Sequence, residues 1–167
     1  RDLIHIVLSR DLALQTESAA PAELVEEALA LVRRGASATQ ADVKADLPGD
    51  LPQVRVDRGR TVRTITSLIF HARKFRDSGD LRLSGESRGS AVVLRLDYAG
   101  QPIATDEAQR SLELLYPGSR AGHTLNAVGL GLGVLRAIAR QKGGDLNIQV
   151  GADGRTALSL SLPVAPR

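Results

Sequence analysis

A glycine-rich run that leads straight into a helical pattern limits the possible folds of this chain more than any other stretch. Its three glycines, Gly129, Gly131 and Gly133, alternate with leucines. Glycine allows a tight backbone bend and a close approach of the backbone to a ligand. The helix that follows would present free, positively polarised N–H groups at its start, which suit a phosphate. We therefore expect a phosphate-binding turn at the start of a helix.

The residues after this run predict how the chain ends. The helical pattern stops at Gly143 and Gly144, and glycine commonly ends a helix. Strands are predicted over 145–150 and 156–163, with a turn between them at 152–154. A helix followed by a hairpin is thus expected at the end of the chain.

The other elements follow from the spacing of apolar residues. Helical periodicity predicts helices over 1–17, 22–34, 60–75 and 105–115. Alternating or continuous apolar residues predict strands over 41–47, 54–57, 81–84 and 91–96. Loops are expected over 97–102 and 116–128. This order predicts an α+β fold, a two-layer α/β sandwich in which helices cover one face of a mixed sheet.

Composition excludes several classes of protein. The 167 residues are 43% hydrophobic but only 2% aromatic, and they include no cysteine, which excludes disulfides and thiol chemistry. The net charge is +3, but basic and acidic residues are interleaved, so no nucleic-acid partner is expected. No apolar run approaches the ~20 residues of a membrane span, and no signal peptide is visible. We expect a cytoplasmic chain without direct membrane contact, although the full-length protein could be membrane-anchored.

Residues 129–163 resemble the end of the catalytic and ATP-binding domain of bacterial sensor histidine kinases. That domain belongs to the GHKL superfamily, shared with gyrase, Hsp90 and MutL, and the resemblance covers roughly residues 21–164. It implies the Bergerat fold, ATP as cofactor and a role in two-component signalling. Gly129, Gly131 and Gly133 match the second glycine box, which lines the triphosphate in such kinases. Thr156 matches a threonine that supports the adenine pocket, with Arg155 where a glycine usually precedes it.

The first glycine box of the family reads Asp-x-Gly-x-Gly after a strand, and residues 97–101 are matched to it. The resemblance implies that Asp97 accepts a hydrogen bond from the adenine amino group, and a charge-assisted bond of this kind is strong. Ala99 and Gln101 replace the two glycines. The competing interpretation makes Asp97 a turn residue at a strand end, and the presence of the second glycine box at 129–133 favours the adenine role.

The helix motif, Leu-Leu-x-Asn-Ala-x-Lys-Phe in the family, is matched by residues 68–75 and departs furthest from its usual form. Lys74 is kept and is predicted to meet a phosphate. His71 replaces the asparagine that binds magnesium, and magnesium prefers hard oxygen ligands, so magnesium is a doubtful cofactor. His71 would either contact a phosphate or serve as a polar plug, and the sequence favours neither. No catalytic or metal-binding residue is predicted in this chain.

Residues 1–17 resemble the end of the second dimerisation helix of these kinases, and residues 18–167 the ATP-binding domain. An apolar stripe, Leu3, Ile4, Val7 and Leu8, predicts a homodimer through this helix. A response regulator or another signalling protein is a further implied partner. The domain would either serve an active kinase or be a degenerate (pseudokinase) version with weak or no catalysis. The alternative function is a nucleotide-independent protein-interaction module of a signalling protein.

Overall fold

The computed structural model describes residues 16–35, 43–100, 132–141, 143–151 and 155–166. Along these parts of the chain the elements are β1 (Thr16–Ala19), α2 (Pro21–Gly35), β2 (Val43–Asp46), β3 (Val54–Asp57), α3 (Arg58–Phe75), β4 (Arg76–Arg88), β5 (Ala91–Gly100), α6 (Leu132–Arg140), β6 (Asp145–Val150) and β7 (Arg155–Pro163). The helix predicted over 105–115 and the loop predicted over 116–128 lie outside the described residues.

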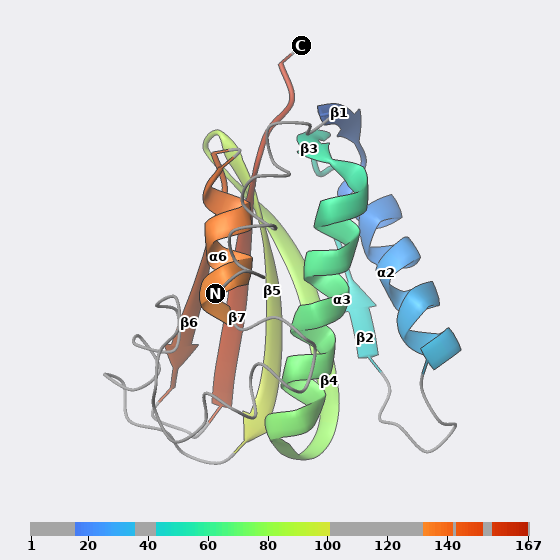
Figure 1. Cartoon of the computed structure of the whole chain (residues 1–167), viewed down its shortest axis with the longest axis vertical. Helices are drawn as coiled ribbons and strands as arrows, with labels where there is room; N and C mark the ends of the chain where they lie inside the picture. Colours follow the sequence, from blue (N-terminus) through green and yellow to red (C-terminus); the bar gives the residue numbers. More distant parts are fainter. Residues whose placement is uncertain (1–15, 36–42, 101–131, 142, 152–154, 167) are drawn as a thin grey trace.

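Five strands form the main sheet in the order β2-β4-β5-β7-β6. The pair β2–β4 is parallel and the other pairs are antiparallel. The three described helices cover one face of this sheet, with α2 beside α3 and α6 over β6 and β7 (Figure 1). The predicted α+β two-layer sandwich with a mixed sheet is confirmed.

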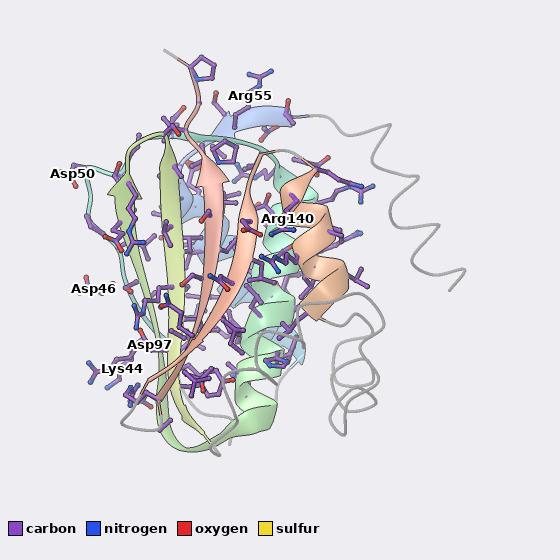
Figure 2. All side chains as sticks on the ribbon, turned by 90° about the vertical axis from the view of Figure 1, so that its left-hand side faces the viewer. Lys44, Asp46, Asp50, Arg55, Asp97 and Arg140 are labelled. Carbon is purple, nitrogen blue, oxygen red and sulfur yellow. The ribbon has the colours of Figure 1, made fainter. Side chains whose placement is uncertain are left out.

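The two faces of the sheet differ because side chains alternate along each strand. In β5, the side chains of Val92, Leu94, Leu96 and Tyr98 are at most 3% exposed and belong to the core under the helices. Arg95 and Asp97 lie between them in the sequence and so project to the other face. Figure 2 shows Asp97 with Lys44 and Asp46 on the side of the sheet that faces away from the helices. We call this side the open face.

The end of α6 forms as the glycine pair predicts. The Gly143 N–H donates to the Arg140 carbonyl over 3.2 Å, and the Gly144 N–H donates to the Ala139 carbonyl over 3.0 Å. Gly143 has a φ of +84°, a left-handed conformation that glycine adopts without a steric penalty. This pair of hydrogen bonds is the Schellman arrangement, which satisfies the last carbonyls of the helix.

The prediction of a helix over 1–17 is wrong at its C-terminal end. Thr16–Ala19 form strand β1, which pairs antiparallel with β3, Thr16 opposite Asp57 and Ala19 opposite Val54. Arg58, at the start of α3, then forms ion pairs with Glu17, Glu23 and Glu27 over 3.6, 3.6 and 2.8 Å. Pairing with a distant strand outweighs the helical preference of Thr16 and Glu17. Residues 1–15 lie outside the described part.

The loop predicted from residue 97 is also wrong over 97–100. Strand β5 continues to Gly100, because β4 and β7 both pair with this segment. Tyr98 occupies the next core position of this strand after Leu94 and Leu96.

No helix among the described residues is long and apolar enough to cross a membrane.

Candidate functional site

The predicted site residues that the structure describes fall on two faces of the sheet. On the helix-covered side lie His71 of α3, 6% exposed, Thr156 of β7, 3% exposed, and the buried Gly133 in the first turn of α6. Asp97 lies on the open face. Lys74 belongs to α3, but its side chain is outside the described part, as are Gly129 and Gly131. The structure thus places three of the predicted residues in the layer between sheet and helices and separates Asp97 from them.

Strand register decides the position of Asp97. In the β5–β7 pairing, Asp97 lies opposite Ala157, and Tyr98 lies opposite Thr156. Residues directly opposite one another in an antiparallel pair project to the same face. Tyr98 and Thr156 therefore share the helix-covered face, whereas Asp97 projects away from it. The prediction that Asp97 contacts adenine beside Thr156 is not supported by this geometry.

The Asp97 carboxylate has a partner on the open face. Arg95, two residues earlier on the same strand, donates from Nε to Oδ2 over 3.1 Å and from Nη2 to Oδ1 over 3.3 Å. The Asp97 side chain is 22% exposed, and that of Arg95 is 46% exposed. This two-point contact keeps the carboxylate on the open face. The alternation of Leu94, Leu96 and Tyr98 is the sequence signal that identifies this face.

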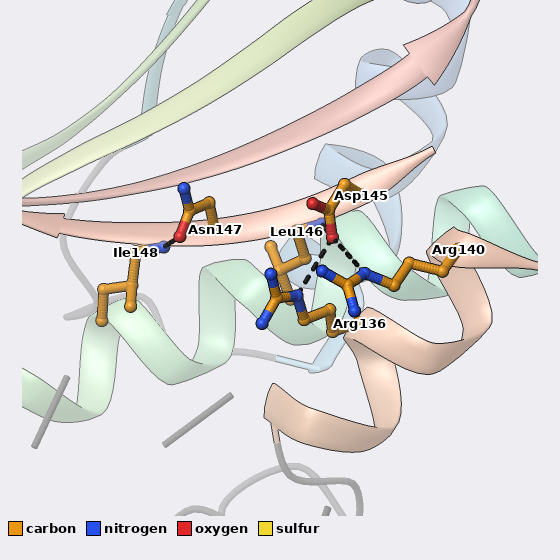
Figure 3. Close-up of polar contacts among 6 residues, drawn as sticks. All are labelled: Arg136, Arg140, Asp145, Leu146, Asn147 and Ile148. Carbon is orange, nitrogen blue, oxygen red and sulfur yellow. Dashed lines mark hydrogen bonds and ion pairs between the residues drawn. The ribbon is translucent and has the colours of Figure 1, made fainter. Parts of the chain in front are cut away.

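A polar cluster that the sequence analysis missed holds α6 against the sheet. Asp145 Oδ1, at the start of β6, accepts hydrogen bonds from Arg136 Nε over 3.0 Å and Arg140 Nε over 2.9 Å (Figure 3). It also accepts the Leu146 N–H over 2.8 Å. Partial burial raises the pKa of Asp145, but these hydrogen bonds outweigh burial and hold the pKa below its usual value. Two arginines one helical turn apart, followed by an aspartate after the glycine cap, are the signal in the sequence.

This cluster fixes the direction of α6 and hence the place of its first turn. Leu132, Gly133, Val134 and Leu135 are all buried in that turn. The first N–H groups of a helix have no partner within the helix, so a helix start in general suits an anion. The predicted phosphate role concerns this turn, and the residues that precede it, 101–131, lie outside the described part.

The other end of the helix layer holds a groove between α3 and α6. Leu160 and Leu162 of β7 line it, together with Thr61, Thr64 and Ile138. None of the predicted site residues lines it. In the described part of the chain, no group of three His, Asp or Glu side chains lies close enough together to hold a metal ion.

Known proteins similar to this chain are histidine kinases. Over 125 residues the chain is 31% identical to the sensor protein KdpD of Rathayibacter rathayi, a match that takes in 74% of this chain and 14% of that protein. Over 164 residues it is 23% identical to the sensor histidine kinase ZraS of Escherichia coli K12, covering 98% of this chain and 34% of that protein. The chain thus spans well under two thirds of the length of these relatives. No protein-family profile matches it.

Solved structures agree in fold. The catalytic domain of histidine kinase ThkA superposes with a TM-score of 0.75 at 17% identity, over 92% of this chain and 100% of that one. Full-length ShkA, solved in complex with AMPPNP, superposes with a TM-score of 0.74 at 17% identity, over 98% of this chain and 37% of that one.

Proposed function

Because the chain belongs to the catalytic and ATP-binding domains of bacterial sensor histidine kinases, we propose that it binds a nucleotide on the helix-covered side of the sheet but catalyses phosphate transfer weakly or not at all. The nucleotide would lie beside Thr156, with its phosphates toward the start of α6. The ATP analogue bound in the structure of ShkA supports this class of ligand.

One observation carries the degenerate part of this proposal. His71 is 6% exposed on α3, where the resemblance has the asparagine that binds magnesium. Magnesium binds oxygen ligands and gives up its water reluctantly, so an imidazole does not replace an amide oxygen. Without a well-held metal, the negative charge that develops during phosphoryl transfer lacks its main stabilisation.

Titration calorimetry of the chain with ATP, with magnesium and with EDTA, tests this function. We expect weak binding whose dissociation constant differs by less than about threefold, or ~0.7 kcal/mol, between the two conditions. A dependence on magnesium of about tenfold or more would show that another oxygen ligand holds the metal, and the degenerate interpretation would then be wrong. The absence of binding in both conditions would instead favour the nucleotide-independent interaction module.

The partners belong to the same proposal. We propose a cytoplasmic homodimer that forms through the segment before β1 and acts on a response regulator or another signalling protein. Burial of one large aliphatic side chain stabilises by about 1.5–3 kcal/mol, so the stripe of Leu3, Ile4, Val7 and Leu8 favours association.

Replacing Ile4 and Val7 together with aspartate is expected to give a monomer, measured by light scattering. The domain should stay folded, because both residues precede Thr16, where the described domain begins. Ser9→Asp is the matched control, since Ser9 falls opposite the stripe at helical spacing and should leave the dimer intact. A native chain that is monomeric at high concentration would contradict the proposed dimer.

A further inference from the structure

We propose that Tyr98, rather than Asp97, meets the purine base in this site, and that the site therefore does not discriminate adenine from guanine. The inference rests on the proposed function, which places the nucleotide beside Thr156. It concerns which side chain recognises the base and what that side chain can distinguish.

The geometry of β5 and β7 carries the first step. Tyr98 lies directly opposite Thr156, and each is 3% exposed on the helix-covered side. Asp97 lies opposite Ala157 of β7 and Arg82 of β4, on the open face. A shift of one residue would be needed to exchange these faces, and it would also carry Leu94 and Leu96 out of the core. Asp97 therefore stays away from a base that lies beside Thr156.

The glycine pattern supports placing the family motif one residue later in the sequence, with the strand register unchanged. If the motif Asp-x-Gly-x-Gly is placed at 98–102 instead of 97–101, its third position falls on Gly100. The match at 97–101 keeps the aspartate and loses both glycines, whereas the match at 98–102 keeps the first glycine and replaces the aspartate with Tyr98. The second match is the one that agrees with the buried face of β5.

The chemistry of the two side chains carries the second step. A carboxylate only accepts hydrogen bonds, so it selects the amino group of adenine over the carbonyl oxygen of guanine at the same position of the ring. A phenol hydroxyl both donates and accepts, so it can bond to either group. Its bond is between neutral groups and is weaker than a charge-assisted one. A tyrosine at this place thus predicts modest affinity and no preference between the two bases.

The test compares ATP and GTP as ligands of the native chain, Asp97→Asn and Tyr98→Asp, by titration calorimetry. The native dissociation constants for ATP and GTP are expected to agree within about threefold. Asp97→Asn should leave both unchanged, because it alters only the open face. Tyr98→Asp should bind ATP at least about tenfold more tightly than GTP. Circular dichroism and thermal unfolding check that each variant is folded.

Two outcomes would overturn this inference and leave the proposed function standing. One is an adenine preference of about tenfold in the native chain that Asp97→Asn removes, which would make Asp97 the base contact. The other is a native preference of that size that Asp97→Asn leaves intact. Neither outcome requires Tyr98→Asp, so both can be tested even if a buried carboxylate prevents that variant from folding. In that case Tyr98→Phe serves as the variant at this position. It should weaken the binding of ATP and of GTP equally. If none of the folded proteins binds a nucleotide, the proposed function fails, and the inference fails with it.

Discussion

Replacement of Gly144 with alanine is expected to lower the free energy of unfolding by about 3 kcal/mol, the upper end of the usual cost of overpacking. A Cβ atom at this position would lie 2.3 Å from the carbonyl oxygen of Ser161 and 3.1 Å from that of Ala139. Both are backbone atoms, so neither can move aside by a change of rotamer. Relief requires a shift of the end of α6 away from β7, which also strains the hydrogen bonds of the helix cap.

Two other glycines provide controls for this prediction. Gly49→Ala should be nearly neutral, since nothing lies within 4 Å of the added Cβ. Gly143→Ala has the same open space but a φ of +84°, so it should cost about 1 kcal/mol of backbone strain. Urea unfolding of the three variants gives the order. A Gly144→Ala protein as stable as Gly49→Ala would show that α6 and β7 do not approach each other as closely as described.

The second large effect is expected at His71. Replacement with asparagine should make ATP binding depend on magnesium, with a gain of about tenfold in affinity when the metal is present, or ~1.4 kcal/mol. The amide oxygen is a ligand of the kind that magnesium prefers, and the position lies on the helix-covered side of the sheet. Calorimetric titration with magnesium and with EDTA measures the change.

His71→Leu is the matched control, because it fills similar space and offers no oxygen. It should bind ATP equally in both conditions, and its thermal unfolding reports whether a bulky side chain at position 71 is tolerated. Equal binding by a folded His71→Asn protein with and without metal would mean that this position does not reach the magnesium.

The sequence by itself determined the elements whose signals are local. The apolar periodicity of α2 and α3 and the glycine pair after α6 predict these helices within a few residues, because capping and amphipathic spacing act over one or two turns. The order of helices and strands predicts the sandwich, and the second glycine box together with the helix motif identifies the family. These inferences required no knowledge of which strands are neighbours.

The tertiary structure alone decided the face on which each strand residue lies. Thr16–Ala19 become a strand because β3 pairs with them, and β5 extends to Gly100 because β4 and β7 flank it. The match of Asp97 to a family motif is a statement about spacing, and a displacement of one residue along a strand moves a side chain to the opposite face. Register depends on the pairing of segments far apart in the sequence, such as the pairing that places Tyr98 opposite Thr156. That is why the helices and the fold could be predicted from the sequence, whereas the side chain that meets the base could not.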